Sequence, residues 1–324
     1  MKSPAIGVLF ALCAGVLWGL VFLVPLLLPQ QSPALLSLGR YLAFGLVCLP
    51  LALFQWRSLQ ALTARDWRKA FALSVVGNFV YYGFLASAIQ TLGNPLPSLM
   101  IGTLPVVIMV CANLGWAQAQ SAPRVQWRRL LLPCALLLAG LSCVNAQELA
   151  LLGAVSAQQY WLGLGCAFLA VAAWTWYPLV NDKHLKAHPQ IAASTWATAQ
   201  GLATLLPAAA LFTVFAMQAQ GSNAAIAAIP GQFPPLYWTL MLTLGVACSW
   251  LGTLCWNAAC QRLPAAVSGQ LIVFETLAAL VLGYLYRGQG PSAVSLLGIG
   301  LLLGGVVWGV RVFTRQTPPS AVEA

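Results

Sequence analysis

Residues 264–286 read PAAVSGQLIVFETLAALVLGYLY, and this predominantly apolar stretch carries one charged side chain, Glu275. A helix needs about 20 mostly apolar residues to cross the roughly 30 Å hydrocarbon core of a bilayer, because it rises about 1.5 Å per residue. The stretch has that length, and runs of the same kind recur along the chain. The sequence therefore predicts an all-α integral membrane protein.

The overall composition supports this prediction. Charged residues make up 6% of the 324 residues and apolar residues 60%, whereas a soluble domain carries about 25% charged residues. So few charges cannot cover a surface that faces water, which argues against a soluble enzyme, a disordered regulator or a disulfide-stapled secreted domain. The nine cysteines lie in apolar runs without a C-x-x-C pair, so we interpret them as packing residues.

Applied to the whole chain, the length criterion predicts ten transmembrane helices. They lie near residues 5–28, 34–54, 70–91, 95–116, 130–146, 158–180, 190–216, 236–260, 264–286 and 292–314. The fifth is the shortest and contains Pro133. The first is longer than the apolar part of a signal peptide, about 7–15 residues, and lacks a small-residue cleavage site, so we expect it to remain as a membrane helix.

The basic residues predict an orientation. Thirteen of the fifteen fall on one side of the predicted spans: Lys2, Arg57, Arg65, Arg68, Lys69, Arg124, Arg128, Arg129, Lys183, Lys186, Arg262, Arg311 and Arg315. The positive-inside rule then places both termini in the cytoplasm, in a multi-pass protein of the cytoplasmic (inner) membrane. Because short cytoplasmic loops beside anionic lipid explain the net charge of +10, no nucleic-acid partner is expected.

The chain also resembles itself. With an offset of 156, Gly7, Ala11, Ala14 and Trp18 fall on Gly163, Ala167, Ala170 and Trp174. We therefore predict a first five-helix repeat over residues 1–146, a second over 156–314 and a short cytoplasmic tail over 315–324. Since five is odd, the second repeat must be inverted. Inverted repeats are typical of transporters whose substrate site lies near the bilayer midplane between the repeats.

Several segments resemble one family. These are the pairs Trp18-Gly19 and Ser32-Pro33, the run LGRYLAFGLVCLPLAL at residues 38–53, and residues 271–289. They resemble the ten-helix transporters of the drug/metabolite transporter superfamily with two EamA-type repeats, over about residues 5–314. The resemblance implies export of amino acids, other small metabolites or amphipathic drugs by alternating access.

Two charged residues lie inside the predicted spans. A charge there costs at least about 2.5–3.5 kcal/mol, so each needs a role. Glu275, near the midplane of the ninth span, is either a protonatable or cation-binding site or a carboxyl that ties helices together. Arg40, about 10 Å into the second span, either extends its side chain to the interface or pairs with Glu275 as an outer gate.

Polar side chains recur at helical spacing in two further spans. The third span carries Asn78, Tyr81 and Tyr82, and the eighth carries Ser249, Thr253 and Asn257. An offset of 171 superposes Asn78 on Ser249 and Tyr82 on Thr253. Polar stripes in lipid must face protein or water, so they either line a shared cavity or form hydrogen bonds between helices.

Tryptophans and prolines add further candidates. Trp18 and Trp174 lie away from the expected interfaces, where they either stack on a substrate or pack in the core. Pro105 predicts a bend near mid-membrane, and the 171-residue offset aligns it with Thr276, beside Glu275. Corresponding irregular points in two repeats indicate a transport site.

His184 and His188 have the i, i+4 spacing of a metal-binding helix. They lie in the segment NDKHLKAHPQ, expected to be a cytoplasmic loop, and nothing beside them in sequence completes a ligand set. No metal, cofactor or catalytic residue is therefore predicted.

Together these features predict a secondary transporter that exports small amphipathic metabolites such as amino acids by alternating access. Efflux of lipophilic cationic drugs is the alternative. An intramembrane enzyme is disfavoured, because the spans lack a nucleophile or metal motif and Asp66 and Asp182 lie in expected loops. The expected partners are a small-molecule substrate and the lipid bilayer, for a monomer or homodimer.

Overall fold

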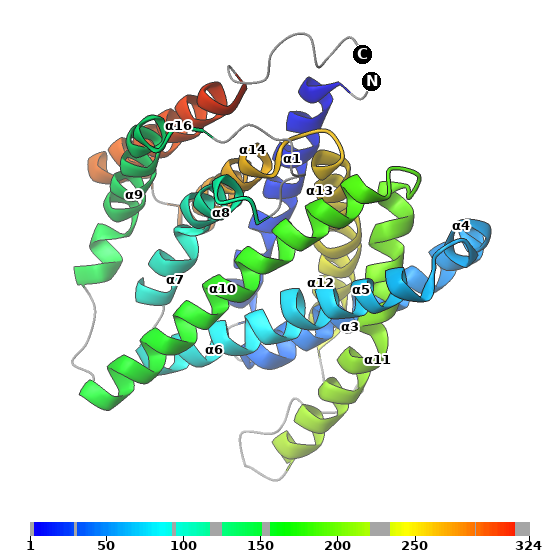
Figure 1. The fold of residues 1–324 in the computed structure, drawn as a ribbon. Coiled ribbons are helices and arrows are strands. Elements are labelled where there is room, and N and C mark those ends of the chain that lie inside the picture. Colours follow the sequence, from blue (N-terminus) through cyan, green and yellow to red (C-terminus); the bar gives the residue numbers. More distant parts are fainter. Residues whose placement is uncertain are drawn as a thin grey trace, which may run out of the picture.

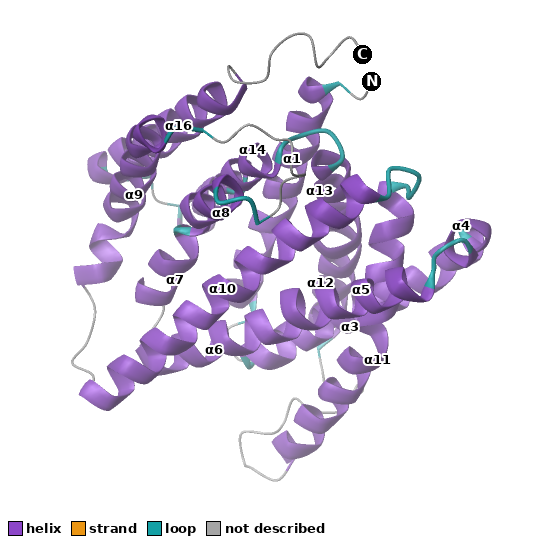
Figure 2. Cartoon of the chain, viewed as in Figure 1, coloured by secondary structure: helices purple, strands orange, loops and turns teal. Residues whose placement is uncertain are grey.

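A computed structural model describes residues 3–28, 31–92, 95–116, 125–150, 156–220, 234–288 and 290–314. Over these residues the chain folds into helices, and none of them is in a strand (Figure 2). Within the described residues, eight helical stretches are long and apolar enough to cross a membrane. The all-α membrane fold class is thereby confirmed. Two predicted spans contain the shorter apolar helices Pro4–Gly19 and Leu104–Asn113, so the count of ten crossings stays a prediction.

The helices follow one another along the chain, and Figure 1 labels most of them. The first part of the chain forms α1 (Pro4–Gly19), the 3₁₀ turn η1 (Leu20–Phe22), α2 (Val24–Leu27), α3 (Pro33–Phe54), α4 (Trp56–Gln60), α5 (Ala64–Ser74), the π-helical η2 (Val75–Val80), α6 (Tyr81–Leu92), α7 (Pro95–Gly102), α8 (Leu104–Asn113) and α9 (Trp127–Ala150). The second part forms α10 (Ala157–Ala187), α11 (Ala193–Gln220), α12 (Pro235–Thr243), the π-helical η3 (Leu244–Leu251), α13 (Gly252–Cys260), α14 (Ala265–Leu271), α15 (Val273–Arg287) and α16 (Ala293–Thr314).

Two helices are longer than the sequence predicted. The fifth span, expected over 130–146, lies within the 24-residue α9, which continues through Pro133. Helix α10 has 31 residues, which is about 46 Å of helix and more than a bilayer core requires. The segment after residue 180 was expected to be a loop, but it remains helical to Ala187. A helix can continue there because no proline or glycine interrupts residues 181–187.

Asp66 was also expected in a loop, but it lies in the first turn of α5. Thr63 and Asp66 form a reciprocal capping box, in which each side chain bonds the other residue's backbone N–H. This arrangement satisfies amide groups that the first helical turn cannot bond internally. It also fixes the direction of the Asp66 carboxylate.

Helices from the first part of the chain pack mainly on helices from the second. Helix α9 packs on α16, α3 on α11, α6 on α10 and α8 on α14, while α1 contacts both α13 and α15 (Figure 1). Small residues make this possible, since a Cβ on Gly19 would lie 2.5 Å from the Cβ of Ala278. Close helix approach at small residues is typical of membrane interfaces. The division into two inverted repeats stays a prediction.

Among the described residues, two kinds of helix irregularity occur in both parts of the chain. Segments η2 and η3 are both π-helical, and an offset of 171 places residues 75–80 on 246–251, inside η3. A second pair consists of breaks: α7 ends at Gly102 just before Pro105, and α14 ends at Leu271 just before Glu275. The helix is therefore interrupted at Thr103, two residues before Pro105, where the sequence predicted a bend. Such irregularities redirect side chains and are frequent at functional sites.

Candidate functional site

Arg40 lies two turns into α3, a helix whose first turn is capped by the Ser32 hydroxyl. Its Nε donates a hydrogen bond of 2.9 Å to Ser249 Oγ on η3. Its guanidinium carbon lies 5.2 Å from the ring centroid of Tyr41, within cation–π range. Arg40 is half-buried, so the hydroxyl and the ring hold its charge inside the bundle.

Glu275 lies in the first turn of α15, directly after the break at Ile272. The N-terminus of a helix has a partial positive charge, which favours a carboxylate there. Among the described residues the ion pairs within 4 Å are His184–Asp66 and Lys186–Asp182. Glu275 and Arg40 therefore do not form the direct pair that we considered for an outer gate.

The two charges nevertheless share one environment. Arg40 acts electrostatically on Glu275, and both residues act on Tyr41, Tyr81 and Cys248. The site thus contains one basic and one acidic side chain that share these neighbours without an ion pair between them. Tyr82 belongs to the same region, because Arg40 and Tyr41 act on it.

Beside these charges lies an aromatic cluster, which we define as Trp18, Tyr81, Trp174, Tyr177 and Trp256. The Trp174 ring stacks between Tyr81, at a centroid distance of 4.8 Å, and Tyr177, at 5.2 Å. Trp18 meets Trp174 edge-on at 6.1 Å and lies 5.4 Å from Trp256. Its Nε1 donates to the Cys248 carbonyl oxygen at 2.9 Å.

The cluster has a buried side and an accessible side. Trp18, Tyr177 and Trp256 are buried, whereas Tyr81 and Trp174 are half-buried. The accessible rings therefore belong to α6 and α10. Because Tyr81 is also one of the groups on which Glu275 acts, the aromatic and the charged parts of the site are continuous.

The remaining predicted site residues bond mainly to other helices. Asn78 Nδ2 donates to Thr204 Oγ1 on α11 at 3.3 Å. Asn257 is fully buried, and its Oδ1 accepts a bond of 2.9 Å from Asn181 Nδ2 on α10. These two residues make the interhelical hydrogen bonds that were weighed against cavity lining. Thr253 is buried in α13.

Tyr41, Tyr177 and Asn181 are site residues that were not predicted from the sequence. Tyr41 was not singled out, although it follows Arg40 directly. Asn181 was expected in a loop, but it is fully buried in α10, where its Oδ1 accepts from Trp196 Nε1 at 2.8 Å and from Gln200 Nε2 at 3.4 Å. The sequence could have indicated Asn181, because it lies four residues after Tyr177 and therefore on the same face of a continued helix. The Tyr177 hydroxyl donates to Gln200 Oε1 at 2.9 Å.

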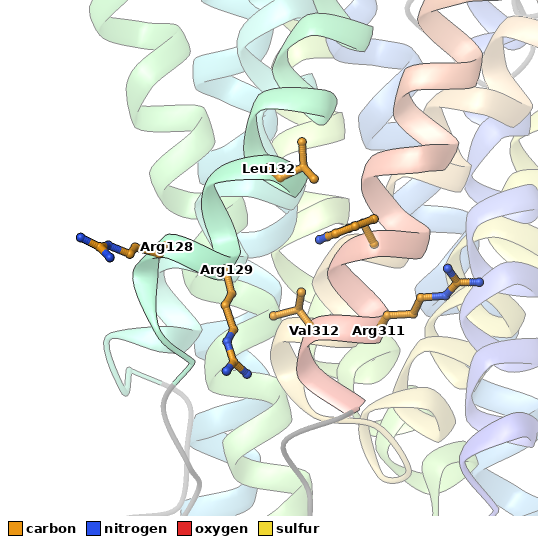
Figure 3. A pocket seen from close by; sticks show the side chains of 6 residues that line it. Arg128, Arg129, Leu132, Arg311 and Val312 are labelled. Atoms are coloured by element: carbon orange, nitrogen blue, oxygen red, sulfur yellow. The ribbon is translucent and has the colours of Figure 1, made fainter.

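Two surface hollows lie elsewhere, and basic residues line both. One lies on α5 beside Arg65, Arg68, Lys69 and Ala72. The other, of about 520 Å³, lies between α9 and α16 and is lined by Arg128, Arg129, Leu132, Trp308, Arg311 and Val312. In Figure 3 the three labelled arginines point apart instead of converging on one point. Basic side chains that diverge around a tryptophan are typical of the lipid headgroup level.

Comparison with known proteins gives consistent matches over nearly the whole chain. A model of the EamA-like transporter family matches residues 5–132 and 161–310. The inner membrane protein YtfF of Escherichia coli (strain K12) is 43% identical over 307 residues, which cover 94% of this chain and 95% of the relative. One solved crystal structure matches with a TM-score of 0.72 at 16% identity, over 98% of this chain and 100% of the other, and this likeness shows the fold alone.

Proposed function

The chain belongs to the EamA-like transporter family, and we propose that it is a secondary exporter of small zwitterionic or amphipathic metabolites such as amino acids. The observation that carries this proposal is the relationship of Arg40 to Glu275. They are opposite charges in one environment, without a direct ion pair between them. A zwitterion supplies the complementary charge to each.

The orientation of Arg40 supports this choice of substrate. Its Nε is engaged by Ser249, and the terminal nitrogens of the guanidinium suit a carboxylate, which arginine binds in a planar, two-point geometry. The substrate ammonium would lie at Glu275. The apolar side chain of the substrate would contact Tyr81 and Trp174, the accessible rings of the aromatic cluster. In surroundings of low dielectric, each of these interactions is stronger than in water.

Efflux of a lipophilic cation is the second candidate. Glu275 and Trp174 alone can accept a cation, by charge and by cation–π contact. Such a substrate leaves Arg40 without a role and places a second positive charge near it. The hydrogen bond that positions Arg40 therefore favours the zwitterion.

Transport would follow alternating access across the inner membrane. The helix breaks before Pro105 and Glu275 and the π-helical segments η2 and η3 are the points at which helices can bend. A proton and the substrate ammonium would compete for Glu275, so a proton gradient could drive export. We place both termini in the cytoplasm because the basic residues gather on that side, and we propose a monomer or homodimer without catalytic activity.

Flux in proteoliposomes tests the proposal. Labelled amino acids and one lipophilic cation would be supplied to the purified protein, with and without a pH gradient. Saturable amino-acid flux that the gradient accelerates is the expected result. Flux of the cation alone supports the second candidate, and absence of both fluxes contradicts the proposed substrate class.

A further inference from the structure

His184 is buried near the end of α10, with a relative exposure of 8%. Its ring stacks on Trp196 at a centroid distance of 4.3 Å, and Trp196 is itself held by the bond to Asn181. The buried Nε2 of His184 has no hydrogen-bond partner among the described residues. Burying a polar atom without a partner is unfavourable, so this nitrogen requires an explanation.

The group that faces this nitrogen is Asp66 of α5. Asp66 Oδ2 accepts from both the backbone N and the Oγ1 of Thr63, each at 2.7 Å. The other oxygen, Oδ1, lies 3.4 Å from His184 Nε2. The capping box therefore holds one carboxylate oxygen and directs the second toward the imidazole. Asp66 is 118 residues away from His184 in the sequence, and only the packing of α5 on α10 brings them together.

His188 completes a group of three. Its Nδ1 lies 3.0 Å from the His184 carbonyl oxygen, to which it donates a hydrogen bond. In the neutral ring this hydrogen bond places the proton on Nδ1 and leaves the lone pair of Nε2 for a ligand. A histidine that binds a metal commonly donates its other ring N–H to a backbone carbonyl in this way. One donor atom from each of Asp66, His184 and His188 lies within 4.8 Å of the other two.

We propose that Asp66, His184 and His188 form a site for a divalent transition metal of the Zn²⁺ class. Two imidazole nitrogens and one carboxylate oxygen suit Zn²⁺, which takes such ligands at about 2.0–2.2 Å and leaves a fourth position for water. Tetrahedral ligands at that distance are about 3.3 Å apart. The His184–Asp66 distance already has this value, and His188 is the ligand that must move closer. The ion would link α5 to α10.

Basic residues flank the site, since Arg65, Arg68 and Lys69 line one hollow on α5 beside Asp66. On α10, Lys186 Nζ forms an ion pair of 2.7 Å with Asp182 Oδ2, which lies one helical turn before it. Lys69, one turn along α5, acts electrostatically on His184. Because Lys69 opposes a bound cation, Lys69→Gln is expected to tighten metal binding, an effect that a purely structural Asp66–His184 contact does not produce.

Zinc titration of the full-length chain tests the site. The protein would carry an affinity tag without histidines and be stripped with chelator in detergent. Zn²⁺ would then be titrated in competition with a chromophoric chelator. We expect one Zn²⁺ per chain, and we expect Asp66→Asn and His188→Ala each to weaken binding at least about 10-fold. Gln190→Ala, an exposed change two residues after His188, is the matched control and should bind as the wild type does.

Two further measurements distinguish a metal site from a purely structural contact and from binding at cysteines. Zn²⁺ should raise the melting temperature of the wild type but not of the Asp66→Asn and His188→Ala proteins, each of which should still melt cooperatively. Co²⁺ should give visible bands without sulfur-to-cobalt charge transfer, because no cysteine is a ligand. Binding that is absent from the wild type, unchanged in both variants, or accompanied by a thiolate band overturns the proposal.

Discussion

Arg40 Nε donates a 2.9 Å hydrogen bond to Ser249 Oγ, and this bond joins α3 to η3 across 209 residues of sequence. Ser249 lies in a π-helical turn, where one extra residue in the turn changes the direction in which side chains point. From the sequence, Glu275 was the partner considered for Arg40. The partner of Arg40 is thus a neutral hydroxyl, and in the proposed function its positive charge binds the substrate carboxylate.

Ser249→Ala should therefore weaken substrate affinity while leaving the protein folded. Hydrogen bonds to charged groups contribute about 1.5–3 kcal/mol, so we expect KM for an amino acid to rise about 10-fold. Arg40→Gln should abolish amino-acid transport. Flux in proteoliposomes measures both. An unchanged KM in Ser249→Ala would mean that the bond does not orient Arg40 for substrate.

Glu275→Gln should remove the response of transport to a pH gradient. The amide keeps the size of the side chain but neither carries a charge nor exchanges a proton at working pH. We expect the variant to lose accumulation of substrate against its gradient. Exchange of substrate across the membrane without a gradient should be at most weak. A Glu275→Gln protein that still accumulates solute against its gradient, with unchanged pH dependence, would falsify proton coupling through this residue.

Trp174→Leu should raise KM about 3- to 10-fold, because ring contacts of this kind contribute about 0.5–1.5 kcal/mol. Trp174→Phe retains an aromatic face between Tyr81 and Tyr177 and should recover most of the affinity. Trp161→Leu changes an exposed tryptophan of the same helix and is the control. Equal effects at positions 161 and 174 would contradict a substrate contact.

Asn181→Leu should destabilise the protein by about 2–3 kcal/mol. The leucine leaves buried groups of Trp196, Gln200 and Asn257 without their partner, and each unsatisfied group is costly. The fraction that stays monodisperse after heating in detergent measures the loss. Ser142→Ala, which removes an exposed hydroxyl bonded within its own helix, should have no measurable effect.

Gly298→Ala and Gly300→Ala should differ, although both lie on α16. A Cβ on Gly298 would lie 2.7 Å from the Gly140 carbonyl oxygen of α9, whereas one on Gly300 meets nothing within 4 Å. We expect a loss of about 1–3 kcal/mol for Gly298→Ala. Gly300→Ala should leave stability unchanged or raise it by up to about 1 kcal/mol. Identical melting of the two variants would contradict close packing of α9 on α16.

The residues that the sequence singled out meet in different combinations from those expected. Trp18, Tyr81 and Trp174 do form one cluster. Asn257, expected as a lining residue or as an interhelical tie, bonds Asn181, a residue that was expected in a loop. Periodicity predicts which face of a helix is polar, but it contains no information about which neighbour that face meets.

The sequence by itself determined that the protein lies in a membrane and that its fold class is all-α. A chain with 6% charged residues and repeated apolar runs of about 20 residues is expected to fold as helices in a bilayer, because a run of that length crosses the hydrocarbon core as a helix that satisfies its own backbone. The lengths of the runs placed the spans, and short motifs indicated the family.

Only the tertiary structure decided the partners of the polar side chains. Ser249 bonds Arg40 in place of Glu275, and Asp66 reaches His184 and His188 because α5 packs against α10. These contacts depend on the rotation of each helix about its axis and on how closely small residues let two helices approach. Both are set by packing between distant parts of the chain, and residue spacing within one helix does not encode them.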